Sequence, residues 1–282
     1  MLPTVCVIIP TYNQAAFIAK AVTSALQQDY PNMQVVVADD HSSDDTRGVL
    51  DPFVRSGRVQ YFSSEANMGR VANYRHALTK YTAAEWVVNL DGDDHFTNPG
   101  FISAAMRAVQ AAGCEDVLFF QGTNLLRCQG ERDEPGFTET EKSRTITARE
   151  YFFQYFRRSN FSHMATLYNR SAALASRFYE VDVLSTDVYS FLRLCLGNLD
   201  KKVIVSNLVA GVWLQHDANT SKSIDLAVHL RNYRLLSSLG RLAVQRHLST
   251  AACLLWQLRL SLFYLLLYAG LLVRAGHRRL KA

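Results

Sequence analysis

The chain has 282 residues, of which 49% are hydrophobic and 20% are charged; this composition excludes a disordered protein and allows one substantial core, or one domain with an appendage. Its five cysteines include no C-x-x-C pair, so neither a disulfide framework nor a zinc site is expected, and a reducing compartment is favoured. The net charge of +5 is unevenly distributed, because residues 226–282 hold nine Lys or Arg residues and no acid. Residues 1–225 therefore keep 21 of the 30 basic residues against 25 acids, a net charge of about −4.

The first 121 residues alternate apolar stretches with helical patterns. Apolar stretches predict strands at 5–9, 35–38, 59–62, 86–90 and 117–121. Helices are predicted from Ile18 to about Tyr30, from a cap at 42–44 through Val54, from 67–70 onward, and over 101–111. This alternation predicts β-α-β units and a mostly parallel sheet with helices on both faces. Because the first strand starts without a cleavable leader before it, we expect the body of the protein to stay in the cytoplasm.

The second half of the chain is less regular. Residues 122–146 are polar and predict a long excursion, either a flap or a plain surface loop. After it, the patterns predict an aromatic helix over 147–156, a strand over 164–168, a helix over 186–196, and an apolar strand pair or bend over 202–213. We therefore expect one α/β domain at 1–223, with a donor half at 1–121 and an acceptor half at 122–223.

The tail, residues 224–282, predicts a basic helix followed by an apolar one. Helical spacing places Arg231, Arg234, Ser238, Arg241 and Gln245 on one face and Leu235, Leu239 and Leu242 on another. A basic helix without acids suits an anionic membrane surface. The apolar stretch 251–273 is long enough to span a bilayer, but Arg259 disfavours a span, so an interfacial or re-entrant hairpin is favoured. A helical pair packed on the domain or in a homodimer is the alternative.

Carboxylates follow two of the predicted strands directly. Asp39 and Asp40 follow one strand, and Asp91, Asp93 and Asp94 follow another. Ligands of such sheets bind beyond the carboxyl ends of the strands, so these acids would share one edge with the Pro10–Asn13 turn. Carboxylates this close repel one another unless a cation is present, and hard oxygen ligands suit Mg²⁺ or Mn²⁺.

The ordered motifs resemble glycosyltransferase family 2, a family of inverting nucleotide-sugar enzymes with the GT-A fold. They comprise Val7-Ile-Ile-Pro-Thr-Tyr-Asn13, Ala25-Leu-Gln-Gln-Asp-Tyr-Pro-Asn32, Val35-Val-Val-Ala-Asp-Asp-His-Ser-Ser-Asp44, Asn67-Met-Gly69 and Leu90-Asp-Gly-Asp-Asp94. The resemblance covers roughly Thr4–Ser223. It implies a metal-dependent, inverting transferase that moves a sugar from a nucleotide-diphosphate sugar, expected to be a UDP-sugar, to a hydroxyl of a glycan or lipid-linked acceptor.

The same resemblance implies a nucleotide-sugar site in which Tyr12 packs on the base and Asp40 accepts from the ring N–H. The full set is Pro10, Thr11, Tyr12, Asn13, Asp40, Asn67, Gly69, Arg70, Asp91 and Gly92. Mn²⁺ or Mg²⁺ would be held by Asp91, Asp93 and His216, and Asp94 could share this role. His163 is a weaker candidate for a metal or phosphate contact.

Asp187 is the predicted general base, because Thr186-Asp187 resembles the family's acidic motif with Thr in place of the usual Glu. Asp182 and Glu180 are the nearest alternatives, and a plain helix N-terminal acid is the other interpretation of Asp187. Two further functions stay open: a transferase that loads sugar onto polyprenyl phosphate, and a nucleotide-sugar-binding scaffold without catalysis. A dinucleotide dehydrogenase is disfavoured because no G-x-G-x-x-G follows the first strand, and no nucleic-acid partner is expected.

Overall fold

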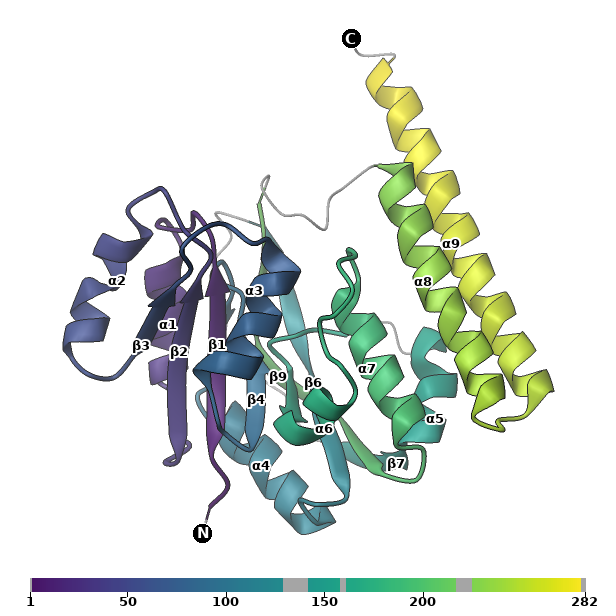
Figure 1. Ribbon diagram of the computed structural model, residues 1–282, viewed down its shortest axis with the longest axis horizontal. Coiled ribbons are helices and arrows are strands. Elements are labelled where there is room, and N and C mark those ends of the chain that lie inside the picture. Colours follow the sequence, from purple (N-terminus) through teal and green to yellow (C-terminus); the bar gives the residue numbers. More distant parts are fainter. Residues whose placement is uncertain (1, 129–141, 158–160, 217–224, 280–282) are drawn as a thin grey trace.

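A computed structural model of the chain describes residues 2–128, 142–157, 161–216 and 225–279. Its centre is one mixed sheet in the order β3-β2-β1-β4-β8-β6-β9-β5, with β7 paired to β9 (Figure 1). The first four strands of this order are parallel: β3 (Gln60–Ser63), β2 (Met33–Asp39), β1 (Val5–Thr11) and β4 (Trp86–Asn89). Their carboxyl ends therefore meet at one edge, as the acidic motifs predict.

The other strands complete the sheet mainly by antiparallel pairing. The bounds are β5 (His95–Phe96), β6 (Val117–Cys128), β7 (Ser143–Thr147), β8 (Thr166–Asn169) and β9 (Lys202–Gln215). β8 runs antiparallel to both β4 and β6, whereas β6 and β9 are parallel to each other. β9 is long enough to pair with β5 and β7 as well.

Alternating residues of the sheet face two separate hydrophobic cores. On β1, Val5, Val7 and Ile9 face the helices α1 (Ile18–Leu26), α2 (Thr46–Arg55) and α4 (Phe101–Ala112). Cys6 and Ile8 face the other side. That side is covered by α3 (Arg70–His76) with the π-helical turn η1 (Ala77–Tyr81), α5 (Ala148–Gln154) with the 3-10 turn η2 (Tyr155–Arg157), α6 (Arg170–Ala175) and α7 (Thr186–Gly197). The predicted arrangement of helices on both faces is confirmed.

The tail forms a hairpin of two long helices, α8 (Leu226–Gln245) and α9 (Thr250–Arg279), beside α5 and α7 (Figure 1). Trp256 is fully buried, stacks on Phe152 of α5 at 4.6 Å between ring centroids, and donates its indole N–H to the Phe152 carbonyl at 3.0 Å. As predicted, Arg231, Arg234 and Arg241 are exposed while Leu239 is buried.

The outer face of α9 remains apolar and exposed. Seven residues of this face have 47–65% of their surface exposed: Leu254, Leu255, Leu258, Leu262, Phe263, Leu265 and Leu266. The segment Thr250–Gly270 is long and apolar enough to cross a membrane by length and composition, with a mean hydropathy of 1.5. We name these seven residues the apolar face of α9.

Several predicted boundaries are wrong. Residues 122–128 continue β6 and residues 143–147 form β7, so the ends of the expected excursion are strands; residues 129–141 lie outside the described part of the chain. The expected strand pair or bend at 202–213 is one strand, β9. α1 ends at Leu26 instead of near Tyr30. The N-cap position of α2 is Asp45, whose side chain makes no cap hydrogen bond, whereas Asp44, within the predicted 42–44, accepts from Thr46 N at 3.1 Å.

Candidate active site

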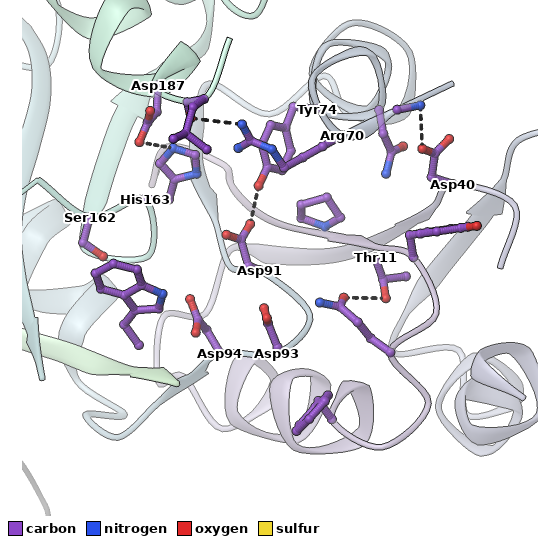
Figure 2. A pocket seen from close by; sticks show the side chains of 18 of the residues that line it. Thr11, Asp40, Arg70, Tyr74, Asp91, Asp93, Asp94, Ser162, His163 and Asp187 are labelled. Atoms are coloured by element: carbon purple, nitrogen blue, oxygen red, sulfur yellow. Dashed lines mark hydrogen bonds and ion pairs between the residues drawn. The ribbon is translucent and has the colours of Figure 1, made fainter. Parts of the chain in front are cut away.

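A cavity of about 680 Å³ lies beyond the carboxyl ends of the parallel strands (Figure 2). It extends from these strand ends to the start of α7. Most of the predicted site residues line it, namely Pro10, Thr11, Tyr12, Asn13, Asp40, Asn67, Gly69, Arg70, Asp91, Asp93, Asp94, His163, Asp187 and His216. Gly92 does not line the cavity: it is buried beneath the β1 turn, where an added Cβ would meet the Gln14 side-chain oxygen and lie 3.0 Å from Thr11 Oγ1.

The turn after β1 presents an aromatic ring to the cavity. Tyr12 is 48% exposed, which leaves its ring available for a flat ligand. Asn13 has a left-handed backbone (φ 52°), and its side-chain oxygen accepts from Ser43 N at 2.8 Å while its own N–H donates to Ser42 Oγ at 2.9 Å. Asn13 therefore anchors the turn to the loop after β2, and this anchoring fixes the backbone that carries Tyr12.

Asp40 holds together the loop that precedes α3. Its carboxylate is 2% exposed and accepts from Met68 N at 2.8 Å and from Gly69 N at 2.9 Å, while Asn67 donates its side-chain N–H to the Asp40 carbonyl at 3.1 Å. Gly69 has φ 89°, a conformation that glycine adopts without strain. Each carboxylate oxygen has two lone pairs, so Asp40 can also accept from a ligand in the cavity.

The three acids after β4 have different partners. Asp91 accepts from the Tyr74 hydroxyl at 2.6 Å, Asp93 lies 2.8 Å from His216 Nε2, and Asp94 accepts from Leu214 N at 2.9 Å. Burial, followed by the charge of Asp91, raises the pKa of Asp93, although His216 opposes the rise. Burial and the charges of Asp91 and Asp93 raise the pKa of Asp94 well above its usual range. Burial and mutual repulsion therefore disfavour the charged forms of Asp93 and Asp94.

A metal centre is not already formed in this arrangement. In the described part of the chain, no three His, Cys, Asp or Glu side chains are grouped closely enough to hold an ion. Asp93 and His216 are in direct contact, and the His216 ring stacks on Phe17 at 4.9 Å between centroids. Asp91 instead points toward Tyr74 (Figure 2).

Asp187, the predicted base, forms an ion pair with His163 across the acceptor side of the cavity. Asp187 Oδ2 lies 2.9 Å from His163 Nε2, and the two side chains are 22% and 10% exposed (Figure 2). Burial alone would raise the pKa of Asp187, but the neighbouring His163 lowers it below its usual range. Burial would lower the pKa of His163, but Asp187 raises it above its usual value. Each partner therefore favours the charged form of the other.

The alternative bases lie elsewhere. Glu180 forms ion pairs with Arg75, at 3.1 Å, and with Arg177, and Asp182 is exposed. Neither lines the cavity. Among the acids proposed for proton transfer, Asp187 alone is therefore placed to reach a substrate there.

Arg70 connects the donor half to the segment before α7. Its guanidinium donates to the carbonyl oxygens of Val183 at 3.3 Å and Leu184 at 3.1 Å, and lies 5.6 Å from the centroid of the Tyr74 ring. Tyr74 lines the cavity but was not predicted as a site residue from the sequence. It stands four residues after Arg70, a spacing that puts both side chains on one helix face. Ser185, also missed, directly precedes the Thr186-Asp187 motif and lines the cavity.

The fold and the site together define an α/β protein with a ligand cleft at the carboxyl edge of its parallel strands, lined by clustered acids. The family model of glycosyl transferase family 2 matches residues 6–175, more than half of the chain. The chain therefore belongs to glycosyl transferase family 2, and the family expected from the sequence is confirmed.

Named relatives are glycosyltransferases. The chain is 27% identical over 182 residues to the GalNAc(5)-diNAcBac-PP-undecaprenol beta-1,3-glucosyltransferase of Campylobacter jejuni, a match that covers 64% of this chain and 56% of the relative. It is 36% identical over 90 residues to the UDP-Glc:alpha-D-GlcNAc-diphosphoundecaprenol beta-1,3-glucosyltransferase WfgD of Escherichia coli, covering 32% and 35%. The matches thus span about half or less of the length of these relatives.

Two solved structures share the fold. TarS residues 1–349 of Staphylococcus aureus, in complex with UDP-GlcNAc, superpose with a TM-score of 0.70 at 18% identity, covering 90% of this chain and 70% of that one. The mannosyltransferase PcManGT of Pyrobaculum calidifontis, in complex with GDP-Man and Mn²⁺, gives 0.63 at 18% identity, covering 98% and 76%. The expected GT-A fold is confirmed.

Proposed function

We propose that the protein is an inverting glycosyltransferase that moves a sugar from a UDP-sugar to a hydroxyl of a glycan or lipid-linked acceptor. One observation carries the proposal: a single cavity contains both the acids at the strand ends and, near the start of α7, Asp187 paired with His163. Such a reaction needs a site for a nucleotide diphosphate and a separate proton acceptor for the incoming hydroxyl. The donor half supplies the first and the acceptor half supplies the second.

The proposed nucleotide site lies between Tyr12 and Asp40. The exposed ring of Tyr12 offers a stacking surface for a base. Asp40 Oδ1 already accepts from Met68 N and from Ser64 Oγ, whereas Oδ2 accepts from Gly69 N and has a second lone pair for a ring N–H. A buried acceptor of this kind discriminates against a base without the donor, because the carboxylate would lose a partner. Pro10, Thr11 and Asn13 would complete the walls.

A divalent ion, Mn²⁺ or Mg²⁺, fits the charge of the acid cluster. Burial and mutual repulsion raise the pKa of Asp93 and Asp94, which is the effect that a cation would relieve. Asp93 and His216 would hold the ion, with Asp91 or Asp94 and the diphosphate oxygens as further ligands. When bound, the ion would supply Lewis-acid stabilisation of the leaving diphosphate. The support for a bound ion comes from the chemistry of these groups, because among the described residues Asp91, Asp93 and His216 do not already form a metal site.

Asp187 would act as the general base toward the acceptor hydroxyl. The carboxylate accepts the hydroxyl proton while the oxygen attacks the anomeric carbon from the side opposite the diphosphate, and this direct displacement inverts the configuration. His163, whose Nε2 lies 2.9 Å from Asp187 Oδ2, favours the ionised form of Asp187 in its half-buried position. A phosphate acceptor would need no such base, so the presence of Asp187 in the cavity favours a hydroxyl over polyprenyl phosphate.

The acceptor is proposed to be carried on a lipid, with the protein bound peripherally at the inner face of the membrane. The Campylobacter and Escherichia relatives are named for acceptors on undecaprenyl diphosphate. In this chain the apolar face of α9 is exposed beside the basic, exposed face of α8, which carries Arg231, Arg234 and Arg241. An apolar strip flanked by cations suits the surface of an anionic membrane. A homodimer that covers the strip is the competing explanation.

Donor turnover tests the function. The protein, incubated with UDP-glucose or UDP-GlcNAc, Mn²⁺ and a lipid-linked glycan that offers a free hydroxyl as acceptor, is expected to release UDP. Asp187→Asn should release it about 100-fold more slowly with UDP binding kept. Asp182→Asn, a change to an exposed acid outside the cavity, serves as the matched control. Failure of the wild type to turn over any of a panel of nucleotide sugars would leave the binding scaffold as the better reading.

Membrane binding needs its own assay. We expect the protein to float with vesicles that contain anionic phospholipid and to bind neutral vesicles weakly, and Leu258→Asp with Leu262→Asp should abolish flotation. If the protein is instead a dimer in sedimentation experiments, and the same two changes make it a monomer, the membrane proposal is overturned.

A further inference from the structure

The segment before α7 is held in place from three directions. Thr186 Oγ1 donates to the Val181 carbonyl at 2.8 Å, within the segment itself. Arg70 donates to the carbonyls of Val183 and Leu184 from the donor half. The third contact comes from Asn232 of α8, in the tail.

Both polar atoms of the Asn232 side-chain amide form hydrogen bonds with Ser185. Its side-chain oxygen accepts from Ser185 N at 3.1 Å, and its side-chain nitrogen donates to Ser185 Oγ at 2.9 Å. Asn232 is 2% exposed and Ser185 is half-buried, so water has little access to the Asn232 side of these bonds. Two bonds to a single residue fix both its position and its orientation.

Neighbouring side chains of the hairpin keep Asn232 in this position. Tyr264 of α9 is 4% exposed and packs edge-on against Tyr233, at 5.4 Å between ring centroids. Burial raises the pKa of the Tyr264 hydroxyl, whereas Asn232 and Ser185 oppose the rise, as expected if its hydroxyl is close to both. α8 also packs directly on α7.

Ser185 is the residue from which α7 starts, and Asp187 lies in the first turn. A shift of Ser185 therefore displaces the Asp187 carboxylate relative to both His163 and the cavity. Proton transfer depends on distances of about 2.6–3.2 Å between heavy atoms, so a small displacement has a large effect on rate.

We propose that Asn232 is a positioning residue for Asp187, so that the C-terminal hairpin completes the active site through the Asn232–Ser185 contact. This inference rests on the proposed role of Asp187 as the general base. The hairpin would accordingly contribute to catalysis without touching the substrate.

The test compares Asn232→Ala with Tyr233→Phe in the full-length protein. Tyr233 is the next residue on α8, and its hydroxyl bonds Ser261 Oγ at 3.0 Å, so Tyr233→Phe removes a hydrogen bond within the hairpin without reaching Ser185. UDP release from UDP-glucose or UDP-GlcNAc, in the presence of the lipid-linked glycan acceptor, gives kcat and KM. Calorimetric titration with UDP and Mn²⁺ measures nucleotide affinity. Asn232→Leu, which keeps the volume of the side chain, replaces the alanine variant if that variant does not purify as a folded protein.

We expect Asn232→Ala to lower kcat about 10-fold or more while UDP affinity changes less than about twofold, and Tyr233→Phe to keep wild-type values. The double variant Ser185→Ala with Asn232→Ala should lose little more than Asn232→Ala alone, because both changes remove the same contact. A purely structural role predicts a parallel loss of kcat and UDP affinity. Additive effects in the double variant would show that Ser185 and Asn232 act independently of each other.

Two results would overturn the inference: a kcat for Asn232→Ala or Asn232→Leu within about twofold of wild type, or the parallel and additive losses just described. Asp187→Asn, measured alongside, separates this failure from failure of the proposed function. If Asp187→Asn turns over at the wild-type rate, the role of Asp187 is wrong whatever Asn232 does.

Discussion

Trp256→Ala should reveal whether the C-terminal hairpin is an integral part of the folded domain. The indole is fully buried, stacks on Phe152 and donates to the Phe152 carbonyl. Truncation of a buried Trp or Phe to Ala costs about 3–5 kcal/mol, because the apolar transfer energy is lost and a cavity remains. The lost hydrogen bond, worth about 0.5–1.5 kcal/mol, and the lost ring pair place the expected value in the upper half of that range.

The assay is urea unfolding followed by circular dichroism, with the free energy of unfolding extrapolated to water. Trp256→Phe should lose about 1–2 kcal/mol, because the stacking remains and the N–H donor does not. Leu258→Ala is the matched control on the same helix: Leu258 is 64% exposed, so its truncation should change stability by less than about 0.5 kcal/mol. A loss below about 1 kcal/mol for Trp256→Ala would refute the packing of α9 on α5.

Three further predictions concern the cavity. Tyr12→Ala should weaken UDP binding by about 1–3 kcal/mol, the usual value of base–aromatic stacking; an unchanged dissociation constant in calorimetry would exclude the ring from the nucleotide site. Asp93→Asn should remove the increase in melting temperature that Mn²⁺ gives in the presence of UDP, while UDP alone still binds; a persisting Mn²⁺ effect would assign the ion elsewhere. His163→Gln should flatten the dependence of the free energy of unfolding on pH. Asp187 raises the His163 pKa against the effect of burial, so the stabilisation from His163 is complete below its unfolded pKa of about 6.5 and is lost as pH rises through its folded pKa. The Asp187 pKa is lowered, so the stabilisation from Asp187 is lost as pH falls through its folded pKa. Equal pH profiles for the variant and the wild type, measured by urea unfolding, would contradict that linkage.

The donor half was predictable because its pattern is local. There, β1, β2 and β4 are short apolar stretches followed directly by predicted site residues, and parallel pairing brings Pro10, Asp40 and Asp91 to one edge. The partners of these residues were not predictable in the same way. The bond from Tyr74 to Asp91 and the pairing of Asp93 with His216 join segments whose separation in the sequence carries no periodic signal.

The second half was harder because its strands depend on tertiary pairing. Residues 122–128 include Gly122 and Asn124, which are typical of loops, yet they continue β6 because β9 runs alongside. Gly122 is explained by close packing of the backbone: a Cβ there would lie 2.6 Å from the Leu208 carbonyl oxygen. β5, with two residues, is too short to produce an alternating pattern.

The predicted boundary between the catalytic domain and the tail marks a change in composition, but the side-chain packing continues across it. Net charge and hydropathy change near residue 224, which is why residues 224–282 were predicted to be a separate membrane-associating unit. In the folded chain, however, Trp256 is enclosed by the same core that holds Phe152, and Asn232 bonds the residue that starts the helix of Asp187. A truncation at residue 224 would expose that core and release Ser185, so loss of activity in such a truncation would not by itself demonstrate a need for the membrane. The point variants Asn232→Ala and Leu258→Asp with Leu262→Asp separate the two roles, because the first breaks the contact with the site and the second changes only the outer face of α9.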